Sequence, residues 1–188
     1  MNAQNFRSSI LGFHKNKLGS VTIEFVFMLI FLTFIFAFLA DLVILRSTTG
    51  KLDNASYSLV NILRERTQLY DRNYKITNED YKQYEQLAKQ LVFGDKNSSK
   101  PLKIVLEYWD QNEQMTLPAT PENQCVPYRK LDTVSYLSPK SEINNERKIP
   151  LYQVTLCVET HSFFKAILLD KSSHSLGWLR SSSMSVAR

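Results

Sequence analysis

Two residues near the start of the chain have types and a spacing that could support a specific chemistry. Gly19 directly precedes a long apolar run, and Glu24 is the fifth residue after it. Because glycine has no side chain, an extended backbone at this position can enter a peptidase cleft. Cleavage after Gly19 would make Ser20 a new N-terminus, and the Glu24 carboxylate could then pair with the free amine of a neighbouring helix. The spacing therefore predicts cleavage followed by helix pairing.

The apolar run explains why Glu24 needs a partner. Phe25–Ala40 is almost entirely apolar, Asp41 interrupts the run, Leu42–Leu45 continue it and Arg46 ends it. This is close to the roughly 20 residues that a membrane-spanning helix needs. An unpaired carboxylate beside such a segment is costly, and pairing offsets part of that cost.

Other export signals fit the run less well. It is longer than the apolar core of a secretory signal peptide, and Phe38 stands where the cleavage motif needs a small residue. No cysteine stands just after the run, which excludes a lipoprotein signal. A plain signal anchor stays open, because Lys15 and Lys17 precede the run. The charge bias is weak, since Arg46 and Lys51 lie just beyond its other end. An anchor alone accounts for neither Gly19 nor Glu24.

The stretch GSVTIEFVFMLIF, which begins at Gly19, resembles a type IV prepilin signal. More closely, it resembles the TadE/TadF pseudopilin family of Tad (Flp) tight adherence pili, in which glycine, glutamate and an aromatic or apolar residue, here Phe25, precede the helix. The segment after Asp41, KLDNASYSLVNILRER at 51–66, is more similar to TadF than to TadE. The resemblance covers about residues 18–70. Glu-Phe in place of Glu-Tyr, and a long chain after it, indicate a minor pseudopilin rather than a major pilin.

The resemblance implies a single-pass protein of the bacterial inner membrane, with its N-terminus in the cytoplasm and its head in the periplasm. The implied segments are a leader removed by prepilin peptidase (1–19), a transmembrane helix (20–46), a periplasmic helical stem (47–70) and a periplasmic head (71–188). Glu24 and Phe25 would set the register of the helix against its partners. Those partners would be a TadE-like pseudopilin, the major Flp pilin and the inner-membrane assembly platform. The alternatives are a minor pseudopilin of a type II secretion-like machine and an uncleaved, signal-anchored periplasmic binding domain.

Cys125 and Cys157 are the two cysteines of the chain, and both lie in the segment that would be exported. An even cysteine count in an oxidising compartment favours a disulfide, and two separate reduced thiols are the alternative. Cys157 and His161 could in principle form a nucleophile pair. On one strand, however, they would lie about 13 Å apart.

The catalytic and ligand-binding motifs that could define another function are missing from the sequence. There is no P-loop, GxGxxG, GxSxG or HExxH motif, and no Cys/His cluster has zinc spacing. The net charge of +5 is modest, and part of it lies in residues 1–19. We therefore expect no enzymatic activity, no cofactor, no metal and no nucleic-acid partner.

Apolar periodicity predicts the elements of the remaining chain. Period-3.6 spacing predicts a half-buried stem helix over 51–70 and a second helix that begins with a Thr77–Asp80 capping box and ends at Gly94. The apolar positions of the two helices are Leu52, Ala55, Leu59, Ile62 and Leu63, and Tyr81, Tyr84, Ala88, Leu91 and Val92.

Period-two alternation predicts strands in the second half of the chain. The candidates are Lys103–Trp109, Met115–Leu117, Leu151–Thr160 and a last edge strand near Met184 and Val186. Aromatic residues such as Phe163 and Phe164 belong either to the core or to a partner surface. The expected fold class is α+β and pilin-like: a long N-terminal helix and a small, mostly antiparallel head with one more helix.

Overall fold

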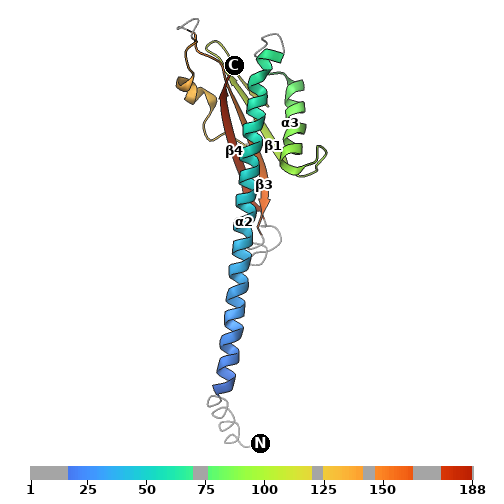
Figure 1. Cartoon of the computed structure of the whole chain (residues 1–188), viewed down its shortest axis with the longest axis vertical. Helices are drawn as coiled ribbons and strands as arrows, with labels where there is room; N and C mark the ends of the chain where they lie inside the picture. Colours follow the sequence, from blue (N-terminus) through green and yellow to red (C-terminus); the bar gives the residue numbers. More distant parts are fainter. Residues whose placement is uncertain (1–16, 70–75, 120–124, 142–146, 163–174, 188) are drawn as a thin grey trace, which may run out of the picture.

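The computed structural model places a small head at one end of a long helix (Figure 1). It describes residues 17–69, 76–119, 125–141, 147–162 and 175–187. The elements are α2 (Lys17–Leu69), α3 (Asn78–Phe93), β1 (Leu102–Trp109), β2 (Gln114–Leu117), the 3-10 helix η1 (Leu131–Leu137), β3 (Leu151–His161) and β4 (Ser175–Val186). The α+β arrangement expected from the sequence is confirmed.

Helix α2 is one continuous helix of 53 residues. Its N-terminal part extends away from the head, and its C-terminal part lies along the sheet (Figure 1). Hydroxyl groups inside the helix bond to its own backbone, as Thr33 Oγ1 donates to the Ile30 carbonyl at 2.7 Å and Thr49 Oγ1 to the Leu45 carbonyl at 2.9 Å. These polar side chains therefore do not interrupt the helix.

The C-terminal part of α2 supplies one side of the main core. Its buried side chains are Leu52, Ala55, Leu59, Val60 and Leu63. Ile62, another apolar position of this stem, is 45 % exposed. Each residue turns a helix by about 100°, so Ile62 points to the edge of the stripe that Leu63 occupies.

Helix α3 begins and ends at the predicted residues. Thr77 and Asp80 form the capping box, with the Thr77 backbone N–H donating to Asp80 Oδ2 at 2.7 Å. Gly94 adopts the left-handed conformation at φ 78°, and its N–H donates to the Gln90 carbonyl at 2.9 Å. Tyr84, Ala88 and Val92 are buried, whereas Leu91, another apolar position of this helix, is 43 % exposed.

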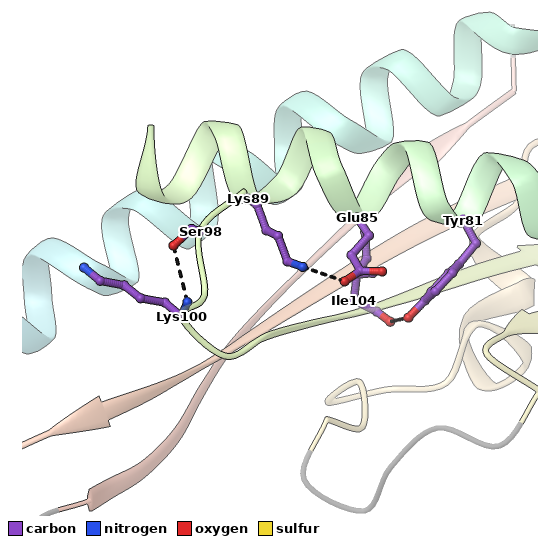
Figure 2. Close-up of polar contacts among 6 residues, drawn as sticks. All are labelled: Tyr81, Glu85, Lys89, Ser98, Lys100 and Ile104. Carbon is purple, nitrogen blue, oxygen red and sulfur yellow. Dashed lines mark hydrogen bonds and ion pairs between the residues drawn. The ribbon is translucent and has the colours of Figure 1, made fainter. Parts of the chain in front are cut away.

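Polar contacts around α3 help to fix it beside β1 (Figure 2). The Tyr81 hydroxyl donates to the Ile104 carbonyl at 3.5 Å, which joins the helix to the strand. Lys89 and Glu85 form an ion pair on the helix itself, with N and O 2.9 Å apart. The pair lies at i, i+4 and is partly exposed, so it stabilises the helix by only a few tenths of a kcal/mol, about 0.3–0.5.

The four strands form one antiparallel sheet in the order β2-β1-β3-β4. One face packs against α2 and α3 and carries the apolar residues Ile104, Leu106, Tyr108, Tyr152, Val154, Leu156 and Val158. The opposite face of β3, expected to be the more polar one, is also buried: Gln153 is 4 % exposed, and Thr155 and Cys157 are fully buried. Residues 125–137, including η1, lie against this face.

Strand β4 is longer than predicted and pairs with β3 over most of its length. Its serines gave no apolar alternation, so the sequence indicated only the last few residues. Two of these serines contact α2, where Ser56 Oγ lies 3.0 Å from Ser181 Oγ and 2.7 Å from Ser183 Oγ. Small side chains on both elements let the helix approach the strand closely.

Candidate functional site

The N-terminal part of α2 carries an exposed apolar surface. Consecutive residues are exposed on all sides, as Phe25, Phe27 and Met28 show with exposed fractions of 62, 66 and 68 %. Exposed apolar area of this extent in a folded protein marks a membrane or protein interaction surface. Within the described residues, α2 is the helix long and apolar enough to cross a membrane, by length and composition.

The residues of the predicted cleavage and register sites lie at the start of this surface. Gly19 and Ser20 belong to the first turns of α2, and Glu24 and Phe25 follow one turn later. Both Glu24 and Phe25 are exposed. The geometry therefore places a carboxylate and an aromatic ring side by side in sequence on the exposed apolar part of α2.

Asp41 interrupts the apolar surface and is buried in the protein. Its side chain is 8 % exposed, and Ser162 Oγ donates a hydrogen bond to Asp41 Oδ2 at 2.6 Å. The sequence left open whether this carboxylate packs or is solvated, and the structure shows that it packs. A hydroxyl donating to a carboxylate at this distance is a strong hydrogen bond, which offsets the cost of burial.

A disulfide joins Cys125 to Cys157, the pair expected from the sequence. It ties residues 125–137 to the outer face of β3, where Val105 and Trp178 pack around it. The bonded Cys157 offers no thiolate to His161, so the nucleophile pair considered for these residues does not exist in this structure. The bridge is a structural link between the two parts of the head.

Further contacts hold the same segment on the sheet. Arg180 Nη1 donates to the Val126 carbonyl at 2.9 Å, and the guanidinium lies 3.8 Å from the centre of the Tyr128 ring. Gln153 Nε2 donates to the Arg129 carbonyl at 3.0 Å. Backbone carbonyls of an irregular segment are thus satisfied by side chains of β3 and β4.

Glu107 is a buried carboxylate that the sequence reasoning did not single out. It is 3 % exposed on β1, beneath the segment 125–137. Desolvation raises the pKa of its carboxyl group, while the Leu131 backbone N–H and the charge of Lys130 oppose the rise. Its Oε2 atom has no hydrogen-bond partner among the described residues. A glutamate between two apolar residues of the strand, Leu106 and Tyr108, was the signal available in the sequence.

No cluster of three or more His, Cys, Asp or Glu side chains in the described part of the chain is arranged to hold a metal ion. Phe163 and Phe164, the predicted aromatic surface, lie outside the described residues.

A long helix with an exposed apolar half and a small α+β head on its other half defines a pilin-like protein. The comparison with protein families assigns the chain more narrowly. The model of the TadF family, tight adherence pilin protein F, matches residues 12–188, and the chain belongs to this family. The match extends well past the part in which the sequence alone showed a resemblance. The comparison with curated proteins found no significant match, and neither did the comparison with solved structures.

Proposed function

We propose that this protein is a minor pseudopilin needed to assemble a tight adherence (Tad/Flp) pilus, and that it acts by helix packing and partner binding rather than by catalysis. The observation that carries the proposal is the exposed apolar surface of α2, joined to a small head in a chain of the TadF family. Pilin families are normally structural. The family match supports a tight adherence pilus over the type II secretion-like machine that the Gly19–Glu24 pattern leaves open.

Processing at Gly19 is the first step of the proposal. A membrane prepilin peptidase removes the cytoplasmic leader 1–19 and leaves Ser20 as the N-terminus. Because Gly19 lies in the first turns of α2, that end of the helix must open before it enters a peptidase cleft. The rest of α2 survives cleavage, crosses the inner membrane and holds the head in the periplasm.

Glu24 is the residue that positions the processed helix. Its carboxylate pairs with the free amine of a neighbouring helix, and Phe25 packs beside that contact. Pairing with an amine offsets the cost of placing a carboxylate in the apolar region, so one axial register between two helices is favoured. The neighbour is a TadE-like pseudopilin, and the assembly platform and the major Flp pilin are further partners.

The variant Glu24→Gln tests this role, because it keeps the size of the side chain and removes its charge. We expect pili on the cell surface to fall about tenfold or more, since a loss of 1.4 kcal/mol in partner affinity is a factor of ten. The readout is pilus yield after shearing, normalised to the amount of the variant in the membrane.

Asp53→Asn is the matched control, because Asp53 is an exposed carboxylate on the same helix outside the apolar surface. It should leave pilus yield unchanged. Normal piliation with Glu24→Gln would remove the register role. A fall of equal size with both variants would show that any loss of charge on α2 is harmful.

A further inference from the structure

The C-terminal end of β3 lies against α2 rather than at the distal end of the head. His161 pairs with Ser175 at this end of the strand, beside a register shift at Thr160/His161. The next residue, Ser162, is buried and donates its hydroxyl to Asp41. Figure 1 shows the end of β3 beside α2, on the side of the head that faces the protruding half of the helix.

The apolar surface of α2 continues past the level of this contact. Leu42, Val43 and Ile44 follow Asp41 in sequence and are 40, 67 and 36 % exposed. Arg46 is the next basic residue, and by helical rise it lies about 7.5 Å further along the axis than Asp41. Along the axis of α2, the end of β3 therefore lies at the same level as the last residues of the apolar surface.

The length of the apolar surface places this overlap relative to a bilayer. From Phe25 to Ile44 the helix rises roughly 30 Å, which is the thickness of a hydrocarbon core. Asp41 would then lie one turn before the end of that apolar stretch, at the boundary between the hydrocarbon and the interfacial layer. The contact with Ser162 keeps the Asp41 carboxylate away from lipid. A carboxylate that faced outward at this level would be exposed to the hydrocarbon, at a high cost.

We propose that the C-terminal end of β3, at His161 and Ser162, rests in the interfacial layer of the bilayer, so that the head binds a lipid surface as well as being anchored by α2. The hydrogen bond from Ser162 to Asp41 sets the depth at which the head sits. This inference rests on the proposed membrane span of α2. It makes the head a fixed extension of the span and limits its tilting on the stem.

Collision measurements on a spin label test the contact. Because Cys125 and Cys157 are bonded to each other, a single introduced cysteine can be labelled selectively. The full chain is reconstituted in vesicles of phosphatidylethanolamine and phosphatidylglycerol, with the label at His161→Cys. Accessibility to oxygen reports lipid, and accessibility to a soluble nickel chelate reports water.

Two further positions make the outcome readable. Val43→Cys reports the apolar surface of α2, and Tyr136→Cys, 67 % exposed on η1, reports the aqueous side of the head. We expect the ratio of oxygen to nickel accessibility at 161 to lie between the values at 43 and 136. A ratio at 161 equal to that at 136, with position 43 in lipid, would overturn the inference and leave the span intact. An aqueous reading at position 43 would overturn the span and the proposed function together.

The depth-setting role of Ser162 needs its own variants. Ser162→Ala removes the hydroxyl, and we expect the label at 161 to shift toward the aqueous value. Ser162→Thr retains a hydroxyl donor and should restore the lipid contact. An unchanged ratio in Ser162→Ala would contradict the role of the hydrogen bond.

Discussion

Glu107 is the residue whose chemistry conflicts most with its surroundings. Its carboxylate is buried between β1 and the segment 125–137, and desolvation raises its pKa above the ordinary 4.5. The folded protein therefore holds this proton to a higher pH than the unfolded chain does. The free energy of unfolding is greatest below the unfolded pKa, falls as pH rises through the window between the two pKa values, and is constant again above the folded pKa.

Replacing Glu107 by glutamine should remove this part of the pH dependence. The glutamine side chain keeps an oxygen that can accept the Leu131 N–H, and it cannot ionise. We expect the free energy of unfolding of Glu107→Gln to fall less than that of the wild type as the pH rises above the ordinary glutamate pKa of 4.5. Urea unfolding of the full chain in detergent, followed at several pH values, measures the difference.

Glu113→Gln is the control for this experiment, because Glu113 is an exposed glutamate in the turn between β1, which carries Glu107, and β2. Its stability profile should be parallel to that of the wild type. If the Glu107→Gln profile is also parallel to the wild type, Glu107 does not titrate differently in the folded and unfolded states, and the stated origin of the pH dependence is wrong.

At the scale of elements, the disulfide adds a covalent link to the hydrogen bonds and apolar contacts that hold residues 125–137 on the sheet. Residues 125–137 form a short 3-10 helix with irregular flanks, and they contact the sheet mainly through carbonyl–side-chain hydrogen bonds and the small apolar clusters around Cys157 and Leu151. The bridge spans a sequence separation of 32 residues. The segment in turn covers Glu107, so the bridge also maintains the burial of that carboxylate.

Opening the bridge should destabilise the head. For a loop of this length, the chain-entropy model gives a loss of roughly 3–4 kcal/mol in the free energy of unfolding. The measurement is denaturant unfolding of the full chain in detergent, with and without dithiothreitol. The double variant Cys125→Ala/Cys157→Ala should show the same loss and no response to the reductant. An unfolding midpoint that stays constant, while a thiol assay shows that the bond is open, would refute this role.

Elements with regular patterns were predictable from the sequence, and long-range contacts were not. The capping box at Thr77 and the alternation in β3 are local signals, and both predicted the observed elements. The serines of β4 give no apolar alternation in the sequence. The strand instead forms by pairing with β3 and by close contact with α2, and both of these are long-range interactions. The burial of Asp41 depends on Ser162, which is 121 residues away, so nothing near Asp41 in the sequence could reveal it.

At the scale of the whole molecule, the two halves of α2 have different environments. One half is covered by the sheet and α3, and the other half exposes apolar side chains in every direction (Figure 1). Such an exposed surface is stable only in lipid or against other helices. Because α2 is continuous, a membrane or a helical assembly that binds its apolar half also positions the head that packs on its other half.

Processing at Gly19 is the step on which the proposed pseudopilin function depends most directly, because the register role of Glu24 requires the free amine of a cleaved helix. The decisive measurement is the N-terminus of the protein purified from membranes of its own host, by intact mass and N-terminal peptide mapping. We predict a chain that starts at Ser20, which makes Glu24 the fifth residue of a retained helix. A chain that still starts at Met1, while the host's prepilin peptidase is active, would contradict the account and reduce α2 to an uncleaved anchor.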